Sequence, residues 1–188
     1  MNRRSIVKCL AAAPFAGVAG SWALMRPAFA KGEKAVEELQ KNWKSLLAAG
    51  ADVAGSAEPP LKLSRDEWKK RLPPEAFEVL RKEGTERAGS SPLDREKRPG
   101  VFACAGCGLP LFTSAMKFDS GTGWPSFFTT IPGAIGTSRD FKLIYPRTEY
   151  HCARCDGHQG HLFDDGPEPT GQRYCNNGVA LRFIPKTG

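Results

Sequence analysis

Four of the six cysteines in this sequence form two close pairs that could hold a metal ion. Cys104 and Cys107 stand in "CAGCG" and Cys152 and Cys155 in "CARCD", so both pairs have the spacing C-x2-C and 44 residues separate them. A tight turn with this spacing brings two thiolates toward one ion, and two such turns complete a tetrahedron. The pattern predicts a zinc site. Because four thiolates leave no open position for a substrate, the zinc is expected to be structural.

Two disulfides are the alternative for these four cysteines, and export from the cytoplasm would favour them. The gap between the pairs is longer than in a minimal zinc ribbon, so several strands are expected to lie between the two turns.

The sixth cysteine, Cys175, stands alone in "TGQRYCNNGV". Arg173 precedes it by two positions and Asn177 follows it by two, so a strand here would point all three side chains to one side. A guanidinium group beside a thiol favours the thiolate, which is the nucleophilic form. A small buried apolar residue is the simpler interpretation of a lone cysteine.

Two histidines, an aspartate and a tryptophan could also belong to a reactive site with Cys175. His158 and His161 lie three residues apart in "HQGHLFDD", where they could transfer a proton or simply lie exposed in a loop. Asp165 could orient a histidine or cap a turn. Trp124, in "SGTGWPSFF", is expected either to be presented by a rigid loop or to lie in the core.

Two short helices are predicted before the cysteine-bearing region. Ser64 and Glu67 form a capping-box pattern for a helix that Pro73 stops. Pro74 suits the first position of a second helix, which Gly84 is expected to end.

Short apolar runs between turn residues follow from residue 101 onward. The best strand candidates are "VFAC", "FKLIY", "HLF" and "VALRFI". We therefore predict a mainly antiparallel β domain over residues 61–186. Before it, residues 31–49 are predicted to be helical and residues 51–60 to form a linker, together a helical segment and linker over 31–60.

Residues 1–30 have the features of an export signal. A basic start with Arg3 and Arg4 precedes an apolar stretch, and Ala28 and Ala30 in "AFA" suit a cleavage site. The paired arginines resemble a twin-arginine signal, which predicts a periplasmic or otherwise exported protein. An uncleaved membrane anchor is the alternative, but the apolar run is short and interrupted, so no stable membrane span is expected after cleavage.

Cleavage would also change the charge and the thiol content. Residues 1–30 carry four basic residues and no acid, so the formal net charge falls from +7 to +3, and Cys9 is lost. A charge of +3 is too weak to favour a nucleic-acid partner. Five cysteines remain, namely the two pairs and Cys175.

The separated motifs together resemble one known family. "RKEGTERAGSSPLD", "GVFACAGCGLPLFTSAMKFDSGTGWPSF" and "RTEYHCARCDGHQGHLFDDGPEPTGQRYCNNGVALRF" are similar, in this order, to the peptide-methionine (R)-S-oxide reductases of the B type. The resemblance runs from about Leu61 to Ile184 and leaves residues 31–60 uncovered.

The resemblance implies a fold of two antiparallel sheets, the β-tent, with a four-cysteine zinc site away from the active centre. It implies Cys175 as nucleophile and Trp124 as the contact for the substrate methyl group. His158 and His161 would line the pocket near the sulfoxide oxygen. The acidic and polar partners would be Asp165, Arg173 and Asn177.

Chemistry of this kind suits the residue types. A thiolate attacks the sulfur of methionine sulfoxide, an acid protonates the departing oxygen, and the cysteine is left as a sulfenic acid. Each sulfoxide epimer has its own reductase, so the implied substrate is the R epimer, in oxidised proteins or peptides.

Two positions depart from relatives. Many carry a resolving cysteine in the tryptophan loop, where this chain has Thr122. We therefore predict that an external thiol reductant, such as a thioredoxin-like protein, reduces the Cys175 sulfenic acid. The second departure is Asn176, which stands where relatives usually have an apolar residue.

The protein is expected to be a monomer.

Two other classes of protein compete with this interpretation. A zinc-stabilised binding module explains the four paired cysteines but not the set around Cys175. A thiol enzyme that handles glutathione adducts would be expected to have a zinc with an open position, which neither cysteine pair leaves.

Overall fold

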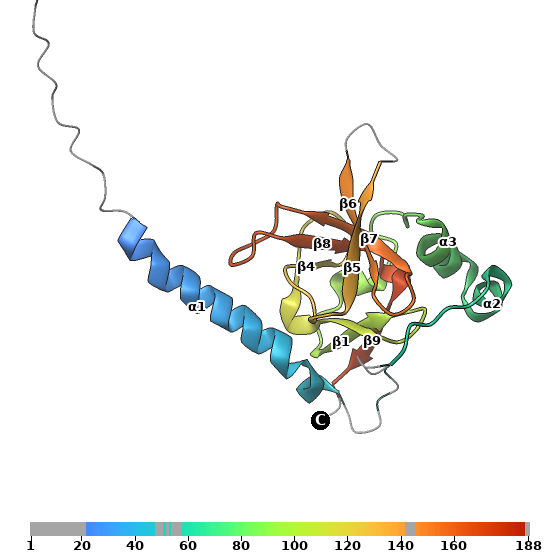
Figure 1. Ribbon diagram of the computed structural model, residues 1–188, viewed down its shortest axis with the longest axis horizontal. Helices are drawn as coiled ribbons and strands as arrows, with labels where there is room; N and C mark the ends of the chain where they lie inside the picture. Colours follow the sequence, from blue (N-terminus) through green and yellow to red (C-terminus); the bar gives the residue numbers. More distant parts are fainter. Residues whose placement is uncertain (1–21, 48–50, 52, 54–57, 142–145, 187–188) are drawn as a thin grey trace, which may run out of the picture.

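The computed structural model describes residues 22–47, 51, 53, 58–141 and 146–186 (Figure 1). Most of the expected export signal and residues 142–145 of the strand predicted at 141–145 lie outside the described residues. Among the described residues, no helix is both long and apolar enough to cross a membrane.

Two antiparallel sheets form the body of the molecule, as predicted. The first has the order β2-β1-β9, with β1 at Gly100–Cys104, β2 at Pro110–Thr113 and β9 at Leu181–Pro185. The second has the order β3-β4-β8-β7-β6-β5. Its strands are β3 (Lys117–Phe118), β4 (Ser126–Phe127), β5 (Ile135–Asp140), β6 (Arg147–Cys152), β7 (His158–Phe163) and β8 (Arg173–Asn176).

Aromatic rings from both sheets meet in the core. Phe112 of β2 stacks on Phe127 of β4 with ring centroids 4.0 Å apart, and Phe102 of β1 meets Phe127 edge-on at 5.1 Å. Tyr150 and Tyr174 add an edge-on pair at 5.5 Å. Because successive side chains of a strand alternate between faces, the neighbours of Tyr174 on β8, Arg173 and Cys175, are left to the other face of the large sheet.

The two predicted short helices are present. α2 spans Arg65–Arg71 and begins with the capping box of Ser64 and Glu67. α3 spans Pro74–Lys82 and buries Ala76, Phe77, Val79 and Leu80. It ends one residue earlier than expected, because Glu83 itself adopts the left-handed conformation, with φ of 55°.

The N-terminal helix differs from the prediction for residues 31–49. α1 spans Trp22–Lys41 and a 3-10 helix, η1, follows at Asn42–Leu46. The change to the tighter helix accompanies the packing of Trp43, which is only 9% exposed, into the core. The side-chain amide of Gln40 donates to Thr129 Oγ1 at 2.8 Å. The end of α1 is thus attached to the β domain, while its beginning projects away from it (Figure 1).

The remaining 3-10 helices lie in the connections, at Pro92–Arg95 (η2), Ser114–Met116 (η3) and Gly178–Ala180 (η4). η4 interrupts the run "VALRFI" that was predicted as one strand. The Glu86 carboxylate explains the interruption, because it accepts hydrogen bonds from the backbone N–H groups of Gly178 (2.6 Å) and Val179 (2.9 Å).

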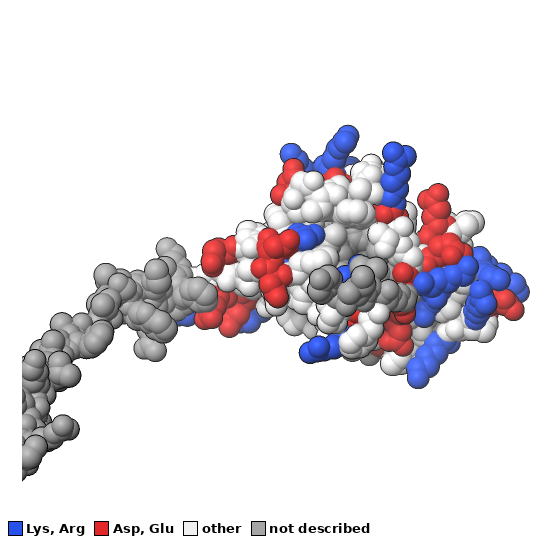
Figure 2. Space-filling view, turned by 90° about the horizontal axis from the view of Figure 1, so that it is seen from above, with Lys and Arg blue, Asp and Glu red and all other residues white. Residues whose placement is uncertain are grey.

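Part of the predicted linker also contacts the domain. Glu58 forms an ion pair with Arg154, and the N–H of Leu61 donates to the Arg154 carbonyl oxygen at 2.7 Å. On the face that Figure 2 shows, Lys and Arg are densest at the end that carries α2 and α3, where Asp and Glu are interspersed among them.

Candidate functional site

Cys175 lies in β8, between β4 and β7 of the large sheet. Ser126 of β4 is its register partner on one side and His161 of β7 on the other. The thiol is half-buried. It borders a cavity of about 130 Å³. The cavity is lined by Thr85, Trp124, Arg147, Gly160, His161, Phe163, Cys175, Asn176 and Asn177.

The strand registers bring a row of polar residues onto the face that carries Cys175. Arg173 of β8 pairs with Phe163 of β7. His161 is the next residue of β7 on the same face, and it pairs with Glu149 of β6. The row continues with Arg147 of β6 opposite Asp140 of β5. Since side chains on directly opposed residues of neighbouring strands share a face, four strands contribute to one site.

Two opposing effects act on the Cys175 thiol. Burial raises its pKa above the ordinary value, while the Arg173 guanidinium and the Thr122 hydroxyl lower it. Burial prevails, so the pKa lies above the ordinary value, although Arg173 favours the thiolate as the sequence predicted. The thiol form of Cys175 is therefore favoured until its proton is taken.

Arg173 is held firmly beside this thiol. Its Nε and NH2 groups donate to the two carboxylate oxygens of Asp165 at 2.7 and 2.9 Å. This pair lowers the pKa of Asp165 and raises that of Arg173. The guanidinium carbon also lies 4.3 Å from the centre of the Phe163 ring. The fork geometry and the ring fix the direction of the guanidinium.

His158 is buried behind His161 and bound to Glu149. The two histidine rings lie edge-on with centroids 5.4 Å apart, and His158 is 2% exposed. His158 Nδ1 donates to Glu149 Oε1 at 2.8 Å, while its Nε2 has no hydrogen-bond partner among the described residues. The cavity is lined by His161 and not by His158.

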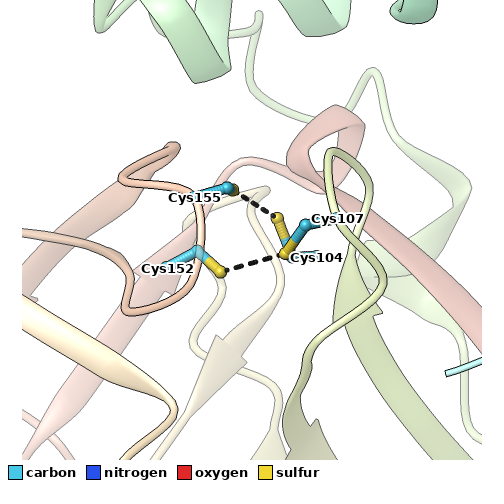
Figure 3. A group of neighbouring side chains, drawn as sticks. All are labelled: Cys104, Cys107, Cys152 and Cys155. Carbon is cyan, nitrogen blue, oxygen red and sulfur yellow. Dashed lines mark hydrogen bonds between the residues drawn. The ribbon is translucent and has the colours of Figure 1, made fainter. Parts of the chain in front are cut away.

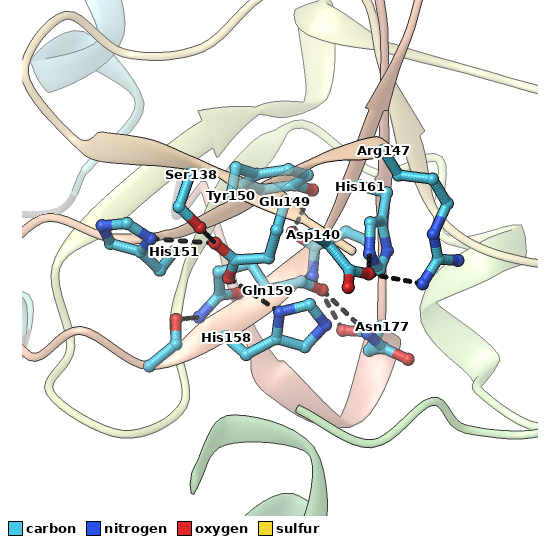
Figure 4. Close-up of polar contacts among 12 residues, drawn as sticks. Ser138, Asp140, Arg147, Glu149, Tyr150, His151, His158, Gln159, His161 and Asn177 are labelled. Carbon is cyan, nitrogen blue, oxygen red and sulfur yellow. Dashed lines mark hydrogen bonds and ion pairs between the residues drawn. The ribbon is translucent and has the colours of Figure 1, made fainter. Parts of the chain in front are cut away.

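Glu149 is the centre of this part of the network (Figure 4). It accepts hydrogen bonds from His158, from His151 Nδ1 at 3.1 Å and from Ser138 Oγ at 2.7 Å. Burial alone would raise its pKa, but these hydrogen bonds outweigh burial and lower the pKa to about 2. Glu149 is therefore a carboxylate, and it holds His158 in the tautomer protonated on Nδ1.

Asp140 holds His161 in a similar way. Its Oδ2 accepts from His161 Nε2 at 2.8 Å and from Arg147 NH2 at 2.6 Å (Figure 4). Burial lowers the pKa of His161, an effect that Asp140 partly opposes. With Nε2–H bound to Asp140, the neutral ring has its lone pair on Nδ1, so His161 is suited to accept a proton.

Trp124 and Asn177 are positioned through Glu86. The Trp124 indole N–H donates to the Glu86 carbonyl oxygen at 3.2 Å, and the Glu86 N–H donates to Asn177 Oδ1 at 3.0 Å. Gly123 precedes the tryptophan with φ of 85°, in the region that favours glycine. One segment before the first strand thus orients two residues of the cavity.

The tryptophan loop supplies a hydroxyl near the nucleophile. Thr122 lies within reach of the Cys175 thiol and shares a hydrogen bond with Ser120 Oγ at 2.8 Å. Cys175 is the only cysteine among the residues that line the cavity.

The four paired cysteines converge in a separate, buried cluster (Figure 3). Their sulfur atoms all lie within 4.8 Å of one another, with Cys104 and Cys155 at 3.7 Å and Cys107 and Cys152 at 3.4 Å. A disulfide would require about 2.05 Å, whereas four thiolates at ~2.3 Å from one zinc ion lie roughly 3.8 Å apart. The cluster therefore fits a metal ion such as zinc and does not fit two disulfides.

Two equivalent turns build this cluster. The N–H of Gly108 donates to the Cys104 carbonyl oxygen at 2.8 Å, and the N–H of Asp156 donates to that of Cys152 at 2.9 Å. Gly108 and Asp156 both have positive φ, 80° and 54°. The repeated turn gives each pair the same approach to the centre of the cluster.

Four of the seven predicted pocket residues line the cavity, namely Cys175, His161, Trp124 and Asn177. Arg173 contacts the lining residue Phe163, Asp165 is bound to Arg173, and His158 lies behind His161. Sequence reasoning missed Asp140, Arg147, Glu149 and Glu86. The alternation of Arg147, Glu149 and His151 in "RTEYHC" was a usable signal, because alternate residues of a strand share a face. Asp140 and Glu86 gave none, since their partners are distant in sequence.

Comparison with known proteins agrees with these features. The SelR domain matches residues 72–185. A relative from Arabidopsis thaliana, "Peptide methionine sulfoxide reductase B1, chloroplastic", is 52% identical over 122 residues, which are 64% of this chain and 60% of the relative. "Peptide methionine sulfoxide reductase MsrB" from Leifsonia xyli subsp. xyli is 47% identical over 71% of this chain and 97% of the relative. The protein of that name from Pseudomonas putida (strain W619) is 50% identical over 65% and 93%.

The matches differ in how much of each relative they cover. The chain spans 60% and 57% of the length of two chloroplastic relatives, but 93% and 97% of two bacterial ones. The solved "Yippee-like" domain of Mis18 covers 48% of this chain at 16% identity and a TM-score of 0.39, which is too low to bear on fold or function. The SelR match and the extent of these identities show that the chain belongs to the MsrB family of peptide methionine sulfoxide reductases, which are oxidoreductases.

Proposed function

We propose that this protein reduces the R epimer of methionine sulfoxide, in oxidised proteins or peptides, to methionine. The observation that carries the proposal is the cavity in which Cys175, His161 and Trp124 meet. A nucleophile, a proton carrier and an apolar ring are the three parts that sulfoxide reduction needs.

Cys175 is the nucleophile in this proposal, and His161 moves its proton. The resting thiol has a raised pKa and His161 a lowered one, so a neutral imidazole faces a neutral thiol. His161 takes the thiol proton as the sulfur of Cys175 attacks the sulfur of the sulfoxide. The proton then passes to the sulfoxide oxygen, and this oxygen moves to the sulfur of Cys175 as the S–O bond of the substrate and the transient S–S bond both break. Thiol and sulfoxide are thereby converted to sulfenic acid and thioether, with no other reactant needed.

The remaining cavity residues would orient the sulfoxide. The Trp124 indole receives the methyl group, and Arg173 stabilises the thiolate while it forms. Asn177 lines the cavity with its amide held by the Glu86 N–H and the Gln159 carbonyl oxygen, and Asp165 keeps Arg173 in place. His158, held by Glu149, supports the ring of His161 from behind. An apolar contact on one side and polar contacts on the other would select one epimer.

An external thiol, such as that of a thioredoxin-like protein, would reduce the sulfenic acid. Support comes from Thr122, which lies within reach of the Cys175 thiol at the loop position where many relatives carry a resolving cysteine. Mass spectrometry after one turnover without reductant tests this step. A mass increase of one oxygen on Cys175 is expected, whereas a disulfide between Cys175 and another cysteine would contradict it.

The four-cysteine cluster is proposed to hold a structural zinc ion. Cys104, Cys107, Cys152 and Cys155 would be its ligands, since their four sulfur atoms converge on one place. The metal would supply folding free energy and take no part in the reaction, since a closed site offers no position for substrate.

The organisation of the chain is also a proposal. Residues 1–30 would be a twin-arginine-like export signal, residues 31–60 a helical segment with a linker, and residues 61–186 the catalytic domain of an exported, monomeric protein. A twin-arginine route would fit a zinc protein, because zinc could be loaded in the cytoplasm before export. Cell fractionation and N-terminal sequencing of the product would test this organisation.

One comparison of variants tests the central proposal. The purified protein and a dithiol are incubated with each epimer of methionine sulfoxide, using wild type and Cys175→Ser. Turnover of the R epimer alone, lost in the variant, is expected. Equal turnover of both epimers would overturn the assignment. If neither the wild type nor Cys175→Ser turned over either epimer, the zinc-stabilised binding module would be favoured instead.

A further inference from the structure

A chain of buried polar side chains runs through the core from the four-cysteine cluster to the end of β8. It consists of Cys104, Gln159, Asn176 and Tyr150. All four residues are 0% exposed, and they lie among the aromatic rings between the two sheets. Since burying an amide is costly unless its hydrogen bonds are satisfied, two buried amides at this place require an explanation.

Gln159 is the pivot of this chain. Its side-chain Nε2 donates to the Sγ of Cys104 at 3.4 Å. Its main-chain carbonyl oxygen accepts two hydrogen bonds from Asn177, from the backbone N–H at 2.8 Å and from Nδ2 at 2.9 Å (Figure 4). One residue of β7 therefore contacts both a proposed zinc ligand and a residue of the cavity.

Asn176 connects the side chain of Gln159 to the rest of β8. Its Nδ2 lies 3.4 Å from Gln159 Oε1 and 2.8 Å from the Asn177 carbonyl oxygen. Its Oδ1 accepts a hydrogen bond from the Tyr150 hydroxyl at 2.7 Å. Every polar atom of both amides thus has a partner, as in a network that fixes one arrangement.

A bound metal would set the direction of all these hydrogen bonds. A zinc-bound thiolate accepts hydrogen bonds and cannot donate them. The NH2 group of Gln159 must then face Cys104, which turns its Oε1 toward Asn176. The NH2 group of Asn176 must in turn face Gln159, so its Oδ1 is left to accept from Tyr150. The donors that the structure contains follow this order.

We propose that Gln159 and Asn176 are positioning residues that couple the four-cysteine site to the end of β8, where Cys175 and Asn177 lie. The inference rests on the proposed role of Cys175 as nucleophile. It also gives a reason for Asn176, since an apolar side chain there would leave Gln159 Oε1 without this donor.

The test substitutes residues at one end of this series of hydrogen-bonded side chains and measures the properties of the site at its other end. Asn176→Leu and Tyr150→Phe keep the volume of the side chain and remove the polar link, and neither contacts a cysteine of the cluster in the hydrogen bonds described. Zinc release to a chromophoric chelator and the visible absorption bands of the cobalt-substituted protein report on the cluster. Tyr174→Phe is the matched control. It removes a hydroxyl from the same aromatic cluster, but this hydroxyl is not one of the hydrogen-bonded groups that connect Cys104 to Tyr150.

Zinc release should be about tenfold faster in Gln159→Met, since an outer hydrogen bond to a metal ligand is lost. Asn176→Leu should accelerate release roughly threefold and shift the cobalt bands, and Tyr150→Phe should act in the same direction but less strongly. Tyr174→Phe should change neither the rate of zinc release nor the cobalt bands. At the other end, Gln159→Met should lower kcat by at least about fivefold while KM changes less than about twofold.

The inference would be overturned if Asn176→Leu and Tyr150→Phe both left zinc release and the cobalt bands at wild-type values. It would also be overturned if Gln159→Met left kcat unchanged. Zinc release and the cobalt spectrum need no methionine sulfoxide, so a wild type without turnover would refute the proposed function while the coupling to β8 could still be measured. Tyr150→Phe decides the matter if Asn176→Leu fails to fold.

Discussion

At the scale of single residues, the site combines a thiol that is hard to ionise with groups that assist its ionisation. Burial raises the pKa of Cys175, and Arg173 acts against burial. A thiol with a raised pKa reacts slowly with oxidants and alkylating agents, because the thiolate is the reactive form.

Replacing Arg173 by glutamine should make Cys175 still less reactive. The guanidinium lowers the pKa of Cys175 and burial raises it, so the pKa rises further once the guanidinium is removed. We expect the rate of alkylation by iodoacetamide at pH 8 to fall about tenfold, which corresponds to roughly one pKa unit. The profile of rate against pH should move to higher pH. Arg139→Gln, which alters an exposed arginine of β5, is the control and should leave the profile in place.

Glu149→Gln should destabilise the protein at neutral pH. The pKa of Glu149 is lowered in the folded state, from 4.5 to about 2. The ionised carboxylate therefore contributes stability that is fully present above the unfolded pKa and is lost as pH falls from about 4.5 through 2. The contribution is on the order of 3 kcal/mol. Urea unfolding at pH 7 measures it, and a difference between wild type and variant that grew on acidification would contradict the account.

At the scale of elements, the site depends on how closely β7 and β8 approach. Gly160 of β7 is opposite Asn176, and a Cβ on Gly160 would overlap the carbonyl oxygen of Cys175. The glycine in "HQGH" is therefore needed for the pairing that sets His161 opposite Cys175.

Gly160→Ala should separate these two strands. We expect a loss of about 2 kcal/mol or more in the free energy of unfolding, together with at least about tenfold slower sulfoxide reduction, because the nucleophile and His161 move apart. Gly106→Ala is a suitable control, since its Cβ would meet its nearest neighbour at 3.5 Å, an ordinary contact. Equal stability and activity of the two variants would refute this role of Gly160.

The elements that the sequence revealed are those with local signals. The capping box at Ser64 and the proline at position 74 marked α2 and α3, and the C-x2-C pairs marked the cysteine turns. The two-residue strands β3 and β4 and the 3-10 helix η4 carry no such signal, because distant partners such as Glu86 create them. For the same reason the sequence did not indicate that α1 gives way to η1 at Asn42, where Trp43 packs into the core.

At the scale of the whole molecule, the cysteine cluster lies where the two sheets meet. Cys104 ends β1 of the small sheet, and Cys152 ends β6 of the large one. An ion bound by both pairs would join the sheets at one end, while the aromatic core holds them along their length.

Removing the metal should therefore loosen the molecule as a whole. We expect a chelator such as EDTA with mild heating to lower Tm by about 10 °C or more, which corresponds to roughly 3 kcal/mol for a chain of this size. Differential scanning calorimetry before and after zinc is added back checks this. A Tm that stayed constant after the metal was shown to be absent would exclude a structural role.

The N-terminal segment also belongs to the folded unit. Trp43 is buried in the core and Gln40 is bonded to Thr129, just after β4. Trp43→Ala in the full chain should cost about 3 kcal/mol, as expected for a large buried side chain. Trp22→Ala, at the far end of α1, provides the comparison. Thermal unfolding of both variants would show whether the stabilising contact lies at η1.

The size of the cavity limits what the protein can hold. A volume of about 130 Å³ is well below the ~300–1,000 Å³ of a pocket that encloses a whole ligand. In the proposed reaction this cavity would receive the sulfoxide end of one methionine side chain, and the main chain that bears it would stay outside. The choice among damaged proteins would then depend on how far each oxidised methionine stands out from its own fold. A single enzyme of this kind could serve many unrelated client proteins without sharing a sequence motif with any of them.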